Sequence, residues 1–506
     1  MRRSRTGERG LVTVWGAALI VLAWSSASGA APPGGDARPD EDALFGGDDD
    51  ASATPSDRPD EDALFGGDDN GTSAPAGDGR RSEDDIFGGG SVMVEPGAAS
   101  SGGGSELLED PLSIGGQLYL RLAGQINDRG SAGSQALSMP NLLDVYLDAR
   151  PEDRVRGFFS GRLYYDPTIA DGDVDQLGNP RERARVLVDQ LWIKTDIARS
   201  VFVTLGQERI KWGASRIWTP TDFVNATFRD PLAIFDERTG VPMLKLQIPV
   251  DTWNFYLIGL LGGASRFDEP GVAFRIEKAF SASEISLSGT AGKGRRTAFG
   301  ADISTALGPF DLTAEVAVSD ERDTLQYSGD LDFETLTIPT SEEYGKWAAR
   351  FSAGLQYGFK PNDDDVQYLG VEYFYNPIGA DDPDLYPWML FSGGFQPFYL
   401  GQHYLALIWA IPSPGNWDEA TFNLSNIGNL SDRSFITRLD FSVTLHTRLR
   451  LEAYAQVHYG HRGGELRFAL DVPDIPAIPG VLPDGVEAFS VAAPAVLLGL
   501  NLRISI

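Results

Sequence analysis

The chain has 506 residues, with 42 Lys and Arg against 72 Asp and Glu, no cysteine, 58 glycines and 10% aromatic residues. A net charge of −30 disfavours nucleic acid as a partner, because its phosphates would be repelled. Without cysteine the chain has no disulfide scaffold, thiolate metal site, c-type haem attachment or lipoprotein anchor. Only four histidines are present, so we expect neither a metal site nor a cofactor.

The start of the chain has the composition of a leader. Four arginines within the first nine residues precede a largely apolar run over 11–23, and small residues follow up to Ala30. This order of basic, apolar and small residues predicts a secretory signal peptide over residues 1–30. The alternative is a membrane anchor, but the apolar run is short of the roughly 20 residues that span a bilayer. We therefore expect the chain to be exported.

The next part of the chain is strongly acidic. Residues 31–110 hold 21 acidic and 4 basic residues, a net charge of −17, and consist mainly of Gly, Pro, Ser, Ala and Asp. Such a segment has too few apolar residues to offset the entropy lost on folding. The composition predicts a disordered acidic arm over residues 31–111.

The arm contains a repeat. Residues 38–49 recur without change as residues 58–69, and residues 81–89 are a looser copy. Each copy has an aliphatic–Phe pair followed by two glycines, and the pairs are Leu44 and Phe45, Leu64 and Phe65, and Ile86 and Phe87. We interpret these pairs as a docking motif for a periplasmic protein, present three times so that tethering raises avidity. The alternative is a duplicated acidic spacer in which the phenylalanines have no role.

From residue 112 onward, apolar and polar residues alternate with a period of two, which predicts β-strands. In residues 114–126, for example, Ile114, Leu118, Leu120 and Leu122 lie on one face, and polar residues predominate on the other. The clearest runs are 11–13 residues long, about double the usual strand of a globular protein. Strands of this length can cross a bilayer, which takes roughly 9–11 residues.

The pattern predicts about 18 strands, and 16 is tolerable. We expect them near residues 114–126, 142–149, 154–165, 184–195, 200–208, 241–250, 252–262, 271–280, 283–290, 295–306, 309–319, 345–358, 365–375, 400–411, 417–426, 434–445, 447–459 and 491–506. The links after even-numbered strands are short, whereas most links after odd-numbered strands are long, as in 209–240 and 376–399. Alternating short and long links, with aromatic residues near strand ends, are typical of a closed membrane barrel.

The last strand alternates to the final residue, Ile506, and resembles the C-terminal assembly signal of outer-membrane barrels, which usually end on an aromatic residue. Residues 112–506 thus resemble Gram-negative outer-membrane β-barrels of the porin type. The resemblance implies an all-β fold, a transmembrane antiparallel up-and-down barrel, in contact with outer-membrane lipid. It also implies passive diffusion of small hydrophilic solutes, with the arm in the periplasm, and a homotrimer as one candidate assembly.

A barrel of this size leaves an aqueous lumen, and strand parity predicts which charges line it. The basic residues predicted to face inward are Arg121, Arg154, Arg156, Arg162, Lys245, Arg275, Arg350, Arg438 and Arg450, with Lys346 and Arg503. The acidic ones are Asp144, Asp148, Glu277, Asp302, Asp311, Glu315, Glu372, Asp440 and Glu452. This near balance suits neutral or mildly anionic solutes.

The loop 209–240 is the most unusual link. In general porins the loop at this place in the strand order folds into the barrel, so the resemblance implies a pore constriction. Its residues would be Arg209, Lys211, Trp212, Arg216, Trp218, Asp222, Arg229, Asp236, Glu237 and Arg238. Facing charges would orient dipolar solutes, and the two tryptophans would offer a stacking surface for sugars. The alternative is an ordinary extracellular loop whose ion pairs rigidify it.

Catalysis has little support in the sequence. His446 shares a strand face with Ser442 and Thr444, but the lipase-type Gly-x-Ser-x-Gly elbow is missing, so we do not expect an enzyme. Two function classes remain: a weakly selective channel, and a non-conducting anchor or export and assembly component in which the barrel holds the docking arm.

Overall fold

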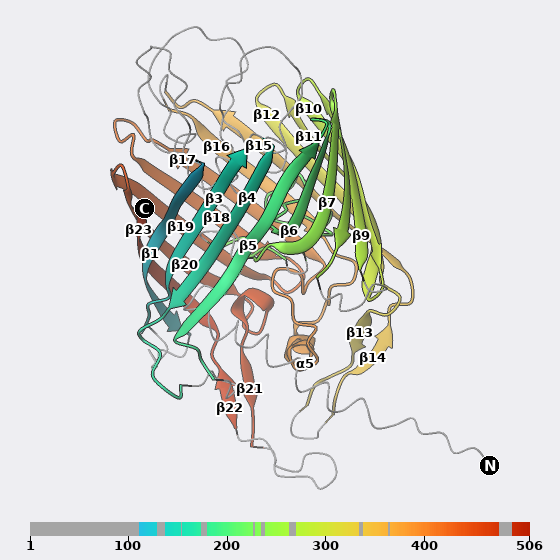
Figure 1. Ribbon diagram of the computed structural model, residues 1–506. Helices are drawn as coiled ribbons and strands as arrows, with labels where there is room; N and C mark the ends of the chain where they lie inside the picture. The colour runs from blue at the N-terminus through green and yellow to red at the C-terminus, as the bar shows by residue number, and fades with distance from the viewer. Residues whose placement is uncertain are drawn as a thin grey trace, which may run out of the picture.

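The computed structural model (Figure 1) describes residues 111–128, 137–152, 154–173, 180–225, 228–233, 238–262, 270–332, 337–362, 365–474 and 488–506. The predicted signal peptide, the acidic arm before residue 111 and the six docking residues lie outside this part of the chain. In the constriction loop, Asp236 and Glu237 also lie outside it.

Eighteen long strands form a closed antiparallel barrel. They are β1 (Leu112–Asn127), β3 (Asn141–Glu152), β4 (Val155–Tyr165), β5 (Ala184–Ile197), β6 (Val201–Glu208), β7 (Val241–Val250), β8 (Trp253–Leu260), β9 (Gly271–Phe280), β10 (Ser283–Gly292), β11 (Arg295–Leu307), β12 (Phe310–Asp320), β15 (Trp347–Phe359), β16 (Gln367–Tyr375), β17 (His403–Pro412), β18 (Ala420–Asn429), β19 (Ser434–His446), β20 (Leu449–Gly460) and β23 (Pro494–Ser505). The predicted fold class and strand number are confirmed.

Each long strand pairs with its neighbours in the sequence, and the last strand closes the barrel on the first. In that closing pair Gln117 lies opposite Ser505 and Leu120 opposite Leu502. A two-residue strand, β2 (Leu137–Ser138), adds a short pairing to β1. The result is the up-and-down order that the alternation predicted, with every strand hydrogen bonded on both sides.

Short and long links lie at opposite ends of the barrel. Tight turns such as 198–200, 251–252 and 281–282 mark what we call the short-turn end, where Asp251 and Ser281 take the left-handed backbone conformation. The long-loop end carries 209–240 and 376–402. The main exception at the long-loop end is the link between β10 and β11, which is only two residues long and joins the two strands in a tight hairpin.

Small elements gather at the long-loop end (Figure 1), and the sequence did not predict them. They are the hairpins β13 (Leu325–Ser328) with β14 (Thr340–Glu343) and β21 (Leu470–Val472) with β22 (Phe489–Val491), the helix α5 (Tyr386–Phe391), and the 3-10 turns η1 (Pro383–Leu385) and η2 (Glu465–Arg467). None of the helices in the described chain is long and apolar enough to span a membrane.

The outer face of the barrel is apolar and exposed. Leu, Ile, Val and Phe side chains such as Val186, Leu191 and Leu287 are between 53% and 74% exposed, which would be unfavourable against water. Aromatic pairs lie toward both ends of the strands, Phe299 with Trp347 at the long-loop end and Phe310 with Tyr357 at the short-turn end. An apolar band between two aromatic girdles is the surface that a lipid-facing barrel presents.

The inner face is polar, and its charges are buried in pairs. Arg275, for example, donates to Glu277 and to both oxygens of Asp302, at 2.8 and 2.9 Å for the latter. Lys245 donates to Glu208 at 2.8 Å. Such pairs keep buried charges compensated, since an isolated one would be strongly unfavourable.

Candidate functional site in the barrel lumen

The loop 209–240, here called the lumenal loop, leaves β6 and enters the barrel. Its first part packs on the inner faces of β7, β8 and β9, where Ile210 and Trp212 join a buried cluster with Met243 and Ile258. These side chains are at most 1% exposed. Without the loop, the apolar residues on this part of the wall would face water. Burial of apolar surface between loop and wall therefore holds the loop in place.

The loop is then fixed to the opposite wall by a carboxylate on β16. Glu372 accepts hydrogen bonds from the backbone N–H groups of Arg216, Ile217 and Trp218, at 2.8–3.2 Å. Three adjacent N–H groups converge on one charged group, which makes each bond stronger than a neutral one. Glu372 therefore fixes the position of the Arg216 backbone inside the barrel.

A second carboxylate, on β12, holds the flanking residues in the same way. Glu315 accepts from the N–H of Ser215 at 2.6 Å and from the N–H and hydroxyl of Thr221 at 3.1 and 2.6 Å. Gly213 lies against this carboxylate with φ of 105°, and a Cβ there would lie 2.6 Å from Glu315 Oε1. The loop can approach the wall this closely only because Gly213 has no side chain.

Both tryptophans of the loop are packing residues. Trp218 is 0% exposed, stacks on Phe374 and donates from Nε1 to the carbonyl of Phe398 at 3.0 Å. Trp212 is 1% exposed and lies beneath the guanidinium of Arg275. Neither indole has a free face, so the expectation that they stack sugars is wrong. Their size fills the space between loop and wall.

The charged residues at the two ends of the loop also make ion pairs. Arg209 pairs with Asp189 of β5. Asp222 accepts from Arg238 at 3.0 Å and from Asn225 at 2.8 Å, and its side chain is 4% exposed. Burial raises the pKa of Asp222 above its ordinary value, while Arg238 and Asn225 oppose that rise. Lys211 is partly buried beside the loop's apolar cluster.

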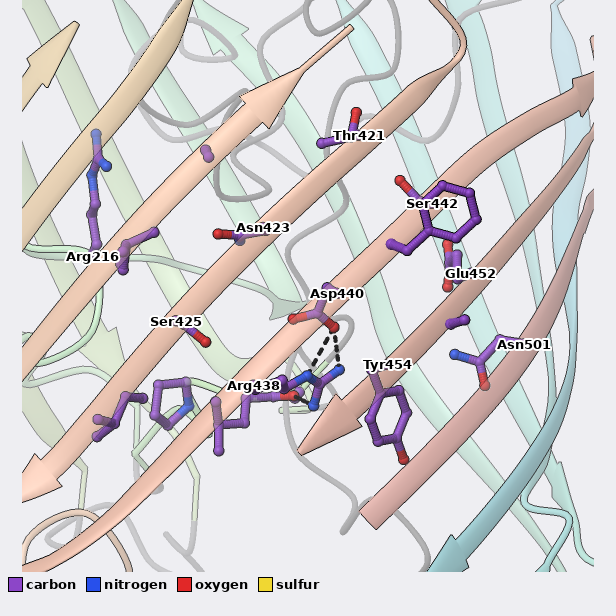
Figure 2. A pocket seen from close by; sticks show the side chains of 18 of the residues that line it. Arg216, Thr421, Asn423, Ser425, Arg438, Asp440, Ser442, Glu452, Tyr454 and Asn501 are labelled. Carbon is purple, nitrogen blue, oxygen red and sulfur yellow. Dashed lines mark hydrogen bonds and ion pairs between the residues drawn. The ribbon is translucent and has the colours of Figure 1, made fainter. Parts of the chain in front are cut away.

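A cavity of about 200 Å³ remains between the lumenal loop and the wall formed by β17, β18, β19, β20 and β23 (Figure 2). We call it the lumenal cavity. From the loop it is lined by Arg216, Ile217, Arg229, Pro231, Leu232 and Ala233; the wall contributes polar residues that include Thr421, Asn423, Ser425, Ser442, Tyr454 and Asn501. The loop and the wall together therefore form one water-accessible space.

Positive charge predominates in the lumenal cavity. Five arginines line it, Arg216, Arg229, Arg438, Arg450 and Arg503, against the two acids Asp440 and Glu452. Figure 2 shows Arg438 and Asp440 pointing toward each other, at 2.7 Å. Arg503 lies 3.7 Å from Glu452. The charged residues of the lining therefore sum to a formal net charge of +3.

Arg438 also fixes the second half of the lumenal loop. Its Nη1 donates to the carbonyl of Leu232 at 2.7 Å, and its guanidinium lies 4.1 Å from the ring centre of Tyr454. The loop is thus held at Glu315, Glu372 and Arg438, on three different strands.

Most other residues predicted to line the lumen do face it. Arg162 lies between Asp144 and Asp189, Arg156 pairs with Asp148, Arg350 pairs with Glu321 at 2.9 Å, and Arg121 is 6% exposed. Arg154 is different. It lies in the β3–β4 turn at the short-turn end, with its side chain 49% exposed and paired with Asp196. Parity failed there because β4 begins one residue later than the pattern predicted, at Val155.

A buried polar network closes the wall at the long-loop end. Glu465 of η2 accepts from the hydroxyl of Tyr404 at 2.7 Å and from Asn429 at 2.8 Å, while Asp432 accepts from the N–H of Glu465 at 2.7 Å. Beside it, an apolar cluster joins α5 to the β21–β22 hairpin through Leu390 and Phe468. We call these loops together the outer cap. Sequence reasoning did not find this network.

One sequence signal would have located the loop-covered walls. Residues 403–411 are apolar on both strand faces, and Tyr404, Ala406 and Ile408 face inward. A lumenal wall that is apolar on its inner face needs a cover, since it cannot face an aqueous pore.

In the described chain, no group of three or more His, Cys, Asp or Glu side chains is arranged to hold a metal ion.

Neither a family model nor a curated protein sequence matches the chain. Its fold resembles several solved structures. OccAB4 of Acinetobacter baumannii is 7% identical with a TM-score of 0.47, covering 79% of this chain and 100% of that one. OpdK, an outer membrane protein of Pseudomonas aeruginosa, is 8% identical with a TM-score of 0.43, covering 78% and 99%. Salmonella typhi OmpF, solved with daunomycin, is 10% identical with a TM-score of 0.38, covering 78% and 97%.

Proposed function

We propose that the protein is an outer-membrane channel through which small hydrophilic solutes diffuse passively. The closed 18-strand barrel with an apolar outer band suits a bilayer, and the polar inner face suits water. The observation that carries the proposal is the lumenal cavity, a wet space bounded by a loop that is fixed across the barrel.

The charges around this space support a preference for neutral and mildly anionic solutes. Arg216 and Arg229 approach it from the loop, while Arg438, Arg450 and Arg503 approach from the wall. Rings of basic side chains favour anions in pores because they lower the electrostatic free energy of an entering negative charge. Asp440 and Glu452 lie on the wall side of the same space, so a transverse field also crosses it.

Ion selectivity tests this proposal. In a planar bilayer under a salt gradient, the full-length protein is expected to give stable conductance steps with a reversal potential that favours chloride. Replacing Arg216 and Arg229 by Ser lowers the local excess from three positive charges to one, so the reversal potential should move toward zero.

Arg322→Ser is the matched control, because Arg322 lies in the exposed link after β12 with its side chain 65% exposed. It should leave the reversal potential unchanged. A cation preference in the wild type, or an equal shift in the control, would contradict the assignment of these arginines to the pore. Folded protein that never conducts would favour the second function class, a barrel that acts as an anchor.

We also propose that the arm lies in the periplasm and docks a partner protein there. The threefold repeat favours this, since diffusion through a barrel does not need it. Changing Phe45, Phe65 and Phe87 together to Ala should abolish capture of the partner by the full-length protein from a periplasmic extract.

The oligomeric state that we propose is a homotrimer. Light scattering in detergent measures the mass of the assembly, and a monomeric mass would contradict the proposal.

A further inference from the structure

The wall of the lumenal cavity includes one strand whose lining side chains are polar but uncharged. Thr421, Asn423 and Ser425 of β18 line the cavity at every second position, and Figure 2 shows them one after another along the strand. Alternate residues of a strand point to the same face, so the three extend over about 13 Å. We call these three residues the uncharged row.

The fold leaves polar groups of this row unsatisfied. Thr421 Oγ1 and Asn423 Oδ1 are buried and have no hydrogen-bond partner in the described chain. A buried polar group without a partner is unfavourable, so a ligand that supplies one gains from the contact. A change of side-chain rotamer turns either group toward the cavity.

An asparagine on the opposite face of the same strand shows the contrast. Asn426 faces outward, and its Nδ2 donates to Thr437 at 2.7 Å and to Tyr459 at 2.7 Å. The lipid-facing amide thus donates to other side chains, as it must where no water is present. The amide of Asn423 lies where a solute can reach it instead.

The charged groups of the lining bind other groups of the protein. Arg438 donates to Asp440 at 2.8 Å and to the carbonyl of Leu232 at 2.7 Å. Arg450 donates to Ser442 at 2.7 Å. A charged solute would have to compete with these contacts, whereas a hydroxyl group that binds at the uncharged row would not.

The lumenal loop covers the other side of the cavity with apolar groups. Pro231, Leu232 and Ala233 line it from the loop and are partly buried. Leu232 also packs against the apolar cluster that contains Ile217 and Ile408. The cavity is therefore polar along β18 and apolar along the loop, so a matching solute has hydroxyl groups at its edge and C–H groups on a face.

The volume of the cavity limits the size of this solute. About 200 Å³ is the volume of roughly seven water molecules in the liquid. A single polyol ring is of this order, whereas a chain of several rings would extend beyond the cavity. Such a ring carries hydroxyl groups at its edge and C–H groups on its two faces, so it matches both sides at once.

We propose that the lumenal cavity binds a neutral polyhydroxylated ring of monosaccharide size. The hydroxyl groups of the ring hydrogen bond to the uncharged row, and its C–H face packs against Pro231 and Ala233. The inference rests on the proposed function, because it names the class of solute that the channel would hold in transit. Binding is weak, as passage requires, since a tightly held solute would not leave.

The natural absence of cysteine allows a direct test. In the full-length protein, Ala233→Cys places one thiol on the loop side of the cavity. The rate of its modification by a neutral maleimide is measured with and without 100 mM D-glucose. We expect about a threefold slower reaction with the sugar, corresponding to an occupancy of about two-thirds. Triethylene glycol, a neutral chain of similar size without a ring, should not protect at the same concentration.

Substitutions in the uncharged row identify its part in binding. Asn423→Leu together with Ser425→Ala, in the thiol background, should abolish the protection by D-glucose. Asn426→Leu is the matched control, because it changes the same residue type on the same strand but faces the lipid; it should keep the protection. Protection that survives the change of the row would overturn the inference.

Two further reporters keep the result clear. Ser442→Cys, on the wall side of the cavity, serves if the first thiol variant folds poorly. Ser341→Cys on the exposed strand β14 should react at the same rate with and without sugar. Absence of protection at both lining thiols, or equal protection by triethylene glycol, would overturn the inference. So would protection by D-glucuronate at about tenfold lower concentration than D-glucose, since charge would then select the solute.

Conductance of the same protein separates this inference from the channel function. Conductance steps that shrink in D-glucose but not in triethylene glycol support both. Steps that are present while the sugar protects neither lining thiol overturn the binding site and leave the channel intact. Protection in a protein that never conducts contradicts the channel and leaves the binding site.

Discussion

Glu372→Leu is expected to give a barrel that folds but conducts severalfold more, with noisy steps. The change removes the acceptor of three backbone N–H groups, at Arg216, Ile217 and Trp218, in a buried place. Each hydrogen bond to a charged group is worth about 1.5–3 kcal/mol, and leaving the donors unsatisfied costs more. The middle of the lumenal loop should therefore leave the wall and widen the path. Single-channel recording measures the change.

The controls for this variant follow from the geometry. Glu372→Gln keeps one oxygen acceptor at the same place, so its conductance should be close to that of the wild type. Glu343→Leu removes an exposed carboxylate from β14, outside the barrel, and should have no effect. Migration of unheated samples in detergent gels shows whether each barrel is folded. A folded Glu372→Leu barrel with wild-type conductance would show that Glu372 does not hold the loop.

Gly213 gives an independent approach to the same loop. Gly213→Ala would place a Cβ 2.6 Å from Glu315 Oε1 at a φ of 105°, so it combines a steric clash with backbone strain. Gly329→Ala carries similar strain, at a φ of 94°, with no atom within 4 Å of the added carbon. The difference between these two variants isolates the clash, and only Gly213→Ala should reproduce the noisy conductance of Glu372→Leu.

Raising the pH from 6 to 9 is expected to loosen the outer cap, and Glu465 is the cause. Burial, and then the charge of Asp432, raise the pKa of Glu465 to about 8 from an ordinary value of 4.5. The hydrogen bonds from Tyr404 and Asn429 oppose this rise without cancelling it. At neutral pH the Glu465 carboxyl group is therefore mostly protonated.

The sign of the effect follows from proton linkage. Between pH 4.5 and 8 the folded cap binds more protons at Glu465 than the unfolded loop does, so its stability falls as the pH rises. The contribution of protonated Glu465 to the stability of the outer cap is fully present below pH 4.5 and is lost as the pH passes through about 8. Ionised Glu465 then lies beside Asp432 in a buried site, where two like charges repel.

Limited proteolysis of the 376–402 loop measures this loosening. Between pH 6 and 9, cleavage of the wild type should accelerate relative to cleavage of Glu465→Gln, whose side chain stays neutral throughout. Since the protease has its own pH dependence, the ratio of the two proteins at each pH is the quantity to compare. A constant ratio would show that Glu465 does not control the cap.

The sequence predicted the barrel because its strands obey a simple rule. Residues on the lipid side must be apolar and residues on the water side are mostly polar, so period-two alternation marks each strand. Predicted 271–280 is β9 to the residue, and predicted 434–445 is β19 within one residue. The 417–426 strand was placed three residues too early, because Asp418 and Glu419 belong to the turn that precedes β18.

The lumenal loop could be predicted only in part. Its charges and length marked it as unusual. The period-two alternation that identifies strands, however, gives no information about where a loop lies in the folded barrel. The roles of Glu315 and Glu372 depend on contacts between residues about 95 to 155 positions apart, which no local pattern records. Trp218 was interpreted as a ligand surface for the same reason, since burial by a distant wall is not visible in a loop sequence. The network around Glu465 was missed because its members come from four separate segments.

The pairing of β1 with β23 has a consequence for how the barrel is made. Every other strand can pair with the strand just before it as the chain emerges, but β1 must wait for residues near Ser505. Until then the growing sheet has two open edges, each able to pair with a foreign chain. Because this last contact has the longest sequence separation, it is the slowest to form. Barrel assembly is therefore most exposed to aggregation just before completion, and a helper that covers the free edge of β1 would act there.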